Sequence, residues 1–214
     1  MTKNVNLSTQ SLVEVDAVTE AEDIAADPRR ARVIEGAMKV FLAYGFARTT
    51  MDDIAKAAEM SRPALYLLFK NKTDIFRAIA AMVMDRSLTQ AQVALAQSGP
   101  FQTRALRAID EALIGMMSEI AASPHGAEIL DMKSSVADLV AGWRDRFADE
   151  LTGSIEAEAR QSRVDLAARG LSTRQLADML LDGLEGMKAR LSDPKQQRHA
   201  AAALIAVIAL ALKP

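Results

Sequence analysis

The chain has 214 residues, half of them apolar and only 4% aromatic, with few glycines and prolines and no cysteine. This composition favours helices over sheets, and the absence of cysteine excludes disulfides and thiolate chemistry. The formal net charge of -2 is unevenly spread: residues 1–27 hold one basic and six acidic residues, whereas residues 28–76 hold nine basic and five acidic ones. The basic excess either binds phosphates, releasing their counterions, or forms a solvated face.

No stretch predicts a membrane anchor. The N-terminus lacks an apolar run like that of a secretory signal, and the longest apolar run, residues 200–212, is shorter than the roughly 18 residues that a span needs. We therefore expect a soluble, cytoplasmic protein with no membrane partner.

The first elements in chain order are an arm and a helix. Residues 1–27 have no sustained apolar period, which predicts a flexible N-terminal arm. From Pro28, apolar residues at helical spacing predict a helix that ends at Gly45. Three arginines near its start, Arg29, Arg30 and Arg32, either reach a DNA backbone or face solvent.

Two short helices follow, joined by a turn at Glu59–Met60. Thr50 followed by Asp53 is a capping signal for the first, and Ser61 or Arg62 caps the second, which runs from Pro63 to about Lys70. Helices this short cannot bury their apolar faces alone, so with the preceding helix they should form a three-helix helix-turn-helix domain over residues 28–76.

On the second short helix, Leu65, Leu68 and Phe69 fall on the apolar face. The residues left to read DNA are Ser61, Arg62, Ala64, Tyr66 and Leu67. Arg62 can form a bidentate bond to guanine, and Leu67 can touch a thymine methyl. The alternatives are that Leu67 is incidentally exposed or packed, and that Tyr66 only packs.

The run from Ala31 to Phe76 resembles the DNA-binding domain of the TetR family of bacterial transcriptional regulators. The residues that carry the resemblance are Phe41, Gly45, Phe46, Thr49, Thr50, Ile54, Ala55, Ala58, Ser61, Leu65, Tyr66, Phe69 and Lys72. The resemblance implies that Thr49 or Thr50, Tyr66 and Lys72 bind DNA phosphates. It also implies that the positions Ser61 to Ala64, which include Pro63, and Leu67 face the major groove. Two positions depart from the family pattern: Glu59 where glycine is common, and Leu68 where an aromatic residue or histidine is usual.

The remainder, residues 77–214, reads as long helices that form a ligand-binding and dimerisation domain, so the whole fold should be all-α. A helix runs from Asn71 to about Ala96, and others carry the apolar residues between Leu106 and Ile120 and between Ala127 and Arg169, with a bend near Met132–Ser135. Large or adaptable side chains in this part suggest a small-molecule pocket, with core packing as the alternative. The candidates are Met82, Met116, Met117, His125, Trp143 and Arg144.

Two helices end the chain, one opened by Ser172 and one from about Lys195 that is apolar nearly all round. Such a pair predicts a dimer interface in the form of a four-helix bundle, which the family resemblance favours, with burial inside one subunit as the alternative. The predicted interface residues are Leu176, Leu180, Leu184, Met187, Leu204 and Ile208.

The function expected from these features is a ligand-responsive regulator, a repressor that binds a palindromic operator as a homodimer and is released by a small-molecule effector. The alternative is a dimeric interaction module that does not read DNA sequence, which Glu59 and the modest basic excess motivate. No catalytic pair, phosphate loop or metal-ligand spacing is recognisable, so we expect no enzyme, no cofactor and no metal site. Both His125 and His199 are expected to have ordinary surface or packing roles.

Overall fold

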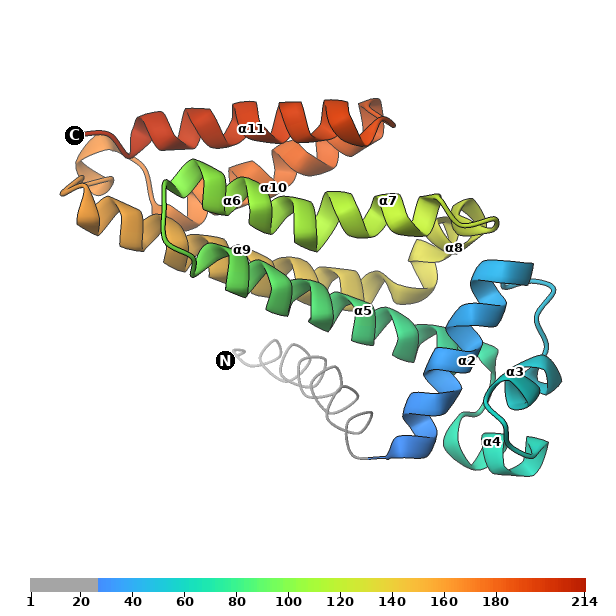
Figure 1. Ribbon diagram of the computed structural model, residues 1–214. Coiled ribbons are helices and arrows are strands. Elements are labelled where there is room, and N and C mark those ends of the chain that lie inside the picture. Colours follow the sequence, from blue (N-terminus) through green and yellow to red (C-terminus); the bar gives the residue numbers. More distant parts are fainter. Residues whose placement is uncertain (1–26) are drawn as a thin grey trace, which may run out of the picture. The chain divides into compact units, whose positions relative to one another are not determined.

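The computed structural model describes residues 27–214, and these are helical without any strand (Figure 1). The predicted arm lies outside the described residues except for Asp27, which caps the first described helix. The long helices and short turns are α2 Pro28–Tyr44, α3 Met51–Ala57, α4 Arg62–Leu68, α5 Lys72–Leu95, α6 Phe101–Ile109, a π-helix Asp110–Ile114, α7 Gly115–Ala121, α8 Gly126–Asp131, 3-10 turns Met132–Val136 and Ala167–Arg169, α9 Ala137–Gln161, α10 Thr173–Arg190 and α11 Pro194–Ala211. The all-α prediction is confirmed.

The chain packs as two compact units. The first contains the described residues up to Asp85 together with Glu119–Gly142, and the second contains Arg86–Ser118 and Trp143–Pro214. The first unit is therefore larger than the predicted domain over residues 28–76, because the segment around α8 also packs against it.

The core of the first unit joins the three N-terminal helices to the start of α5. Ile34 and Phe41 from α2, Ile54 from α3 and Leu65 from α4 are almost fully buried there. Three phenylalanine rings lie together beside them: the centroids of Phe41 and Phe46 are 5.2 Å apart, and those of Phe46 and Phe76 are 5.5 Å apart. The core is closed by Val136 and Leu139, which come from the far part of the chain. Burial of these apolar surfaces is the main force that orients α3 and α4.

The local signals for helix starts are confirmed. The side chains of Asp27, Thr50 and Ser61 each accept a hydrogen bond from a backbone N–H in the first turn of α2, α3 and α4. The Thr50 box is reciprocal, because the Asp53 carboxylate accepts from the Thr50 N–H at 2.9 Å.

Two predicted helix ends differ from the structure. The helix α4 ends at Leu68, not Lys70, because Phe69 is extended and turns into the core. The predicted bend near Met132–Ser135 is confirmed, because the 3-10 turn Met132–Val136 separates α8 from α9 there. Beyond it, α9 ends at Gln161 rather than near Gly170, because Arg163 takes a left-handed conformation and the chain leaves the helix there. The π-helix at 110–114 was not predicted.

In the second unit, α11 packs on α6 and α10, as Figure 1 shows.

The predicted stripe of α9 is buried at all five positions, namely Leu139, Trp143, Phe147, Leu151 and Ile155. Among residues 27–214, no helix combines the length and hydropathy of a membrane span.

The helices α2 and α3 approach each other closely at Gly36. A Cβ at this position would lie 2.9 Å from the backbone carbon of Ala57, so there is no room for one. Gly36→Ala should therefore lower the free energy of unfolding by about 1–3 kcal/mol through overpacking. In contrast, Gly153→Ala should raise it by about 0.5–1 kcal/mol, because Gly153 is helical and a Cβ there meets nothing within 4 Å. Urea unfolding of both variants checks the pair, and equal effects would contradict the close approach.

Candidate nucleic-acid interface

The turn between α3 and α4 contains a residue in an unusual conformation. Glu59 has a φ of 54°, in the left-handed region, and the N–H of Met60 donates to the carbonyl of Ala55 at 3.0 Å. The turn is thus the one that glycine adopts easily, made here by a glutamate at a cost of about 1–2 kcal/mol. Glu59 thus forms the turn between α3 and α4 at the position where the family pattern has glycine.

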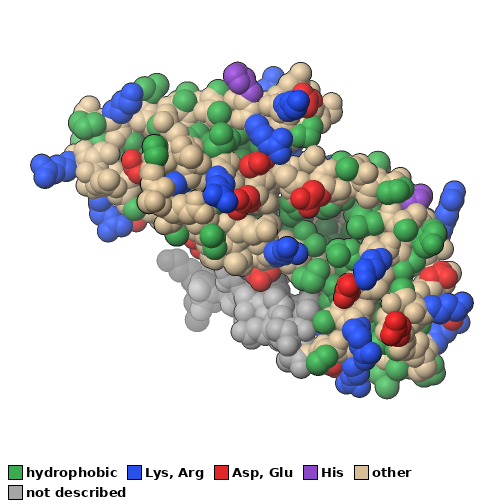
Figure 2. Space-filling model, viewed as in Figure 1, with side chains coloured by type: hydrophobic (Ala, Val, Ile, Leu, Met, Phe, Trp, Pro, Cys, Tyr) green, Lys and Arg blue, Asp and Glu red, His purple; other side chains and the backbone are tan. Residues whose placement is uncertain are grey.

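The exposed face of α4 consists of the residues predicted to read DNA. Leu67 is 85% exposed and Tyr66 is 46% exposed, while Leu65 beneath them is fully buried. The guanidinium of Arg62 lies over the Tyr66 ring, 5.8 Å from its centroid, and hydrogen bonding to Tyr66 raises the pKa of Arg62. Ser61, Pro63 and, in part, Ala64 are also exposed. The structure therefore brings these six side chains together on one surface. On the face drawn in Figure 2, basic and acidic side chains are interspersed over the N-terminal helices at the lower right.

The arginines at the start of α2 have different roles. Arg29 is paired with Asp27, whose pKa is lowered by this hydrogen bond. Arg30 donates to the carbonyl of Leu68 at 3.1 Å, and its guanidinium lies 4.4 Å above the Phe69 ring. Arg30 thus fixes the end of α4, whereas Arg32 is exposed.

The loop Gly45–Thr50 between α2 and α3 is held by the ammonium group of Lys72. Its Nζ donates to the carbonyls of Phe46 at 2.8 Å and of Ala47 and Thr49 at 3.1 Å, and lies 4.6 Å from the centroid of the Phe46 ring. An ammonium group has three N–H donors, and all three are used. Lys72, expected to bind phosphate, is thus directed into the protein.

The two threonines of this loop are distinguished by burial. Thr49 is 2% exposed, and its Oγ1 donates to the carbonyl of Gly45 at 2.7 Å. Thr50 is exposed and caps α3. Of the two, Thr50 lies where a phosphate can reach it.

Sequence reasoning missed Glu128, on the short helix α8. Its Oε1 accepts a hydrogen bond from the N–H of Ala47 at 2.7 Å, and its Oε2 lies 3.6 Å from Nδ1 of His125. No motif surrounds Glu128, and 81 positions separate it from Ala47, so only the tertiary structure reveals the contact.

The predicted ligand residues are divided between the two units. In the first, Met82 packs against the hydrophobic core, and His125 lines a cavity of about 650 Å³ with Tyr44, Arg48 and Lys56. In the second, Trp143 donates from Nε1 to Ser87 Oγ at 2.9 Å, and Met116 and Met117 are half-buried.

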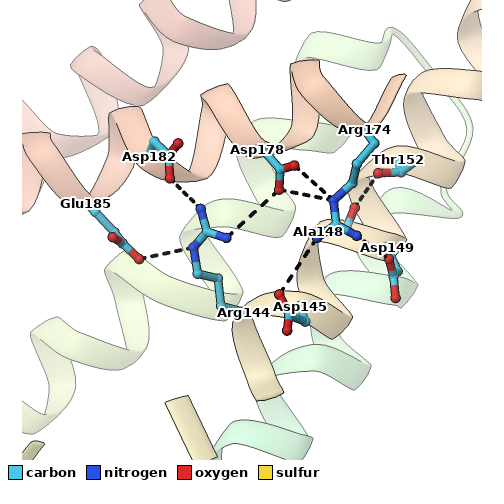
Figure 3. A network of polar contacts seen from close by, with 9 residues as sticks. All are labelled: Arg144, Asp145, Ala148, Asp149, Thr152, Arg174, Asp178, Asp182 and Glu185. Atoms are coloured by element: carbon cyan, nitrogen blue, oxygen red, sulfur yellow. Dashed lines mark hydrogen bonds and ion pairs between the residues drawn. The ribbon is translucent and has the colours of Figure 1, made fainter. Parts of the chain in front are cut away.

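Arg144, the remaining candidate, belongs to an ion-pair network between α9 and α10 (Figure 3). It contacts Asp178, Asp182 and Glu185, while Arg174 contacts Asp145, Asp149 and Asp178. Trp143 and Arg144 thus have polar partners within the fold. A separate cavity of about 580 Å³ in the second unit is lined by residues of α6, the π-helix and α11, including Leu106, Arg107, Asp110, Arg198 and Ile205.

Most of the predicted dimer residues are buried within the single chain. Leu176, Leu180, Leu184, Met187 and Ile208 are each at most 5% exposed, and Leu204 packs over Gly183. The large apolar side chains that α10 and α11 expose are Met179, Val207 and Leu210. Between residues 27 and 214, no three His, Asp or Glu side chains are grouped so as to hold a metal ion.

The fold and this surface define a helix-turn-helix domain, and comparisons show which known proteins it is similar to. Residues 33–79 match the bacterial regulatory proteins, tetR family. The chain is 26% identical over 178 residues to the HTH-type transcriptional repressor Rv1474c of Mycobacterium tuberculosis, covering 78% of this chain and 86% of that protein. It is 45% identical over 47 residues to a probable acrEF/envCD operon repressor of Escherichia coli, covering 22% of this chain and 21% of that one.

Solved structures share the fold. SmeT, the repressor of the Stenotrophomonas maltophilia multidrug efflux pump SmeDEF, matches with a TM-score of 0.56 at 20% identity, over 83% of this chain and 88% of that one. A complex of SmeT with triclosan matches with a TM-score of 0.57 at 18% identity, over 85% and 91%. Residues 33–79 thus carry the domain of the bacterial regulatory proteins of the tetR family, and the chain shares the fold of the SmeT repressor.

The role of Lys72 in the fold can be tested by measuring the stability of protein variants. Lys72→Met should lower the free energy of unfolding by about 1.5–3 kcal/mol, because the three carbonyls lose a charged donor. Lys70→Met is the control: Lys70 is exposed, and its side chain has no polar partner among the described residues, so a change within about 0.5 kcal/mol is expected. Equal stabilities of the two variants in urea would contradict the assignment.

Proposed function

We propose that the chain is a transcriptional repressor that binds a palindromic operator as a homodimer and is released by a small-molecule effector. The observation that carries the proposal is the exposed face of α4, where Arg62, Tyr66 and Leu67 project from a helix whose opposite side is fixed in the core. Two of the relatives are named as repressors, which supports repression rather than activation of transcription. In this proposal residues 28–76 bind DNA, and residues 77–214 bind the effector and the second subunit.

The contacts divide by chemistry. Arg62 reads a guanine through its guanidinium, and Leu67 contacts a thymine methyl, while the backbone of DNA is held by Thr50 and the hydroxyl of Tyr66. Thr49 and Lys72 support these contacts from inside the domain. In a dimer, two copies of α4 read half-sites about one helical turn of DNA apart, or a multiple of it.

The effector site is proposed among the middle helices, near Met116 and Met117. A complex of triclosan with the structurally similar SmeT supports a small organic molecule as the kind of effector. Release from DNA requires only that the effector bind the non-binding conformation more tightly than the DNA-binding one.

Base reading can be tested by selecting bound sequences from random duplex DNA with the purified protein. We expect a palindrome, and Arg62→Ala should reduce discrimination at one guanine of each half-site by about 1–3 kcal/mol. Lys39→Ala is the matched control, because it removes one positive charge from an exposed ion pair with Glu35 on α2. Lost discrimination in both variants, or in neither, would contradict the assignment to Arg62.

The dimer surface can be tested separately. Val207 is 64% exposed on α11, so Val207→Asp should leave the protomer folded but place a charge in the interface, weakening dimerisation by about 3–5 kcal/mol. Val93→Asp, at an exposed position of α5, should leave the dimer intact. Sedimentation velocity measures both, and a dimeric Val207→Asp protein would place the interface elsewhere.

A further inference from the structure

We propose that Glu128 is a positioning residue for DNA binding, although it lies outside the helix-turn-helix. Its carboxylate holds the loop Gly45–Thr50 in the conformation that presents α3 and α4 to DNA. This inference rests on the proposed function, because it explains how the DNA-binding surface keeps its shape.

The loop is held by opposite charges from two sides. At Ala47 the backbone N–H donates to the Glu128 carboxylate at 2.7 Å, and the carbonyl of the same residue accepts from the Lys72 ammonium at 3.1 Å. Hydrogen bonds to ionised groups are stronger than neutral ones. An anion on the N–H and a cation on the carbonyl therefore fix the orientation of the peptide groups that flank Ala47.

The place of the carboxylate depends on the absence of a side chain at Gly45. Gly45 has a φ of 85°, and a Cβ on it would overlap Oε2 of Glu128 and lie 3.1 Å from Nδ1 of His125. The backbone conformation and the free space at this one residue together allow α8 to approach the loop.

The loop leads directly into the DNA-binding surface. Thr49 Oγ1 donates to the carbonyl of Gly45, and Thr50 forms the reciprocal cap with Asp53 at the start of α3. A rotation of the peptides around Ala47 consequently changes the position of Thr50 and of the first turn of α3. Glu128 thereby acts on DNA binding without touching DNA.

Charge alone predicts the opposite effect on affinity. Glu128 places a negative charge on the domain that attracts phosphates, so its removal should strengthen binding if it acts only through the electrostatic field. A positioning role predicts weaker binding. The sign of the change thus separates the two roles.

Two conservative variants separate charge from reach. Glu128→Asp keeps the charge but is shorter by one methylene, so its carboxylate no longer reaches the N–H of Ala47. Glu128→Gln loses the charge but keeps an oxygen in place to accept that hydrogen bond. Asp131→Ala is the control, because Asp131 is exposed on the same helix and has no polar contact within the described residues.

The readouts are amide hydrogen exchange of Ala47 in the free protein and affinity for the selected operator as a function of salt. For Glu128→Asp we expect exchange about 10-fold faster and affinity about 10-fold lower, at an unchanged salt slope, because no phosphate contact is lost. Glu128→Gln should stay within about 3-fold of wild type in both, and Asp131→Ala should keep wild-type exchange and equal or higher affinity.

Three results would overturn the proposal. Unchanged exchange in Glu128→Asp would mean that the carboxylate does not hold the loop, and fast exchange with wild-type affinity would mean that the loop does not control DNA binding. A Glu128→Gln protein that bound no better than Glu128→Asp would mean that an oxygen placed to accept the hydrogen bond of Ala47 does not preserve DNA binding. Wild-type protein that selects no sequence would instead overturn the proposed function, while exchange at Ala47 still decides whether Glu128 holds the loop.

Discussion

The cage of three carbonyls around the Lys72 ammonium is the interaction on which the DNA-binding unit depends. The loop Gly45–Thr50 has no regular secondary structure, and a single cation at the start of α5 donates to the carbonyls of Phe46, Ala47 and Thr49. Because Lys72 opens α5 and the loop opens α3, this contact joins the two ends of the helix-turn-helix.

The reading surface is rigid for a second reason, which is that both ends of α4 are fixed. Ser61 caps its first turn, and Arg30 binds the carbonyl of Leu68 at its last while stacking on Phe69. A helix of two turns would be unstable alone, yet here its caps and its buried Leu65 hold it. DNA binding therefore costs little free energy for ordering α4, because the helix is already ordered in the free protein.

Much of this unit was predictable because its signals are local. These signals lie within a few residues of the structures that they specify, as do the caps at Thr50 and Ser61 and the apolar spacing of Leu65 and Phe69. The inward direction of Lys72 was not predictable, because a lysine near a DNA-binding helix looks the same whether its ammonium meets phosphates or carbonyls. The role of Glu128 was not predictable for a related reason. Its partner is the backbone N–H of Ala47, and a backbone N–H is not specific to any residue type, so no sequence motif marks it.

The difference between local signals and tertiary contacts also explains which predictions for residues 77–214 agree with the structure. The apolar stripe of α9 was correctly predicted to be buried, but spacing cannot say whether a neighbour belongs to the same chain or to a second copy. Leu176, Leu180 and Leu184 therefore looked like an interface, whereas the fold buries them within one chain. Trp143 and Arg144 suggested a pocket from their chemistry, and the structure gives both of them polar partners.

The π-helix at Asp110–Ile114 has a consequence for the helix that contains it. There the N–H of Gly115 bonds to the carbonyl of Asp110, five residues back, and a Cβ on Gly115 would lie 2.9 Å from that oxygen. The wider turn holds one residue more than an α-turn, so every later side chain is rotated by about 100° from the phase set by α6. In an alignment, a relative with a regular helix here would need a single-residue gap, and residues such as Met116 would otherwise be compared with the wrong face of the helix.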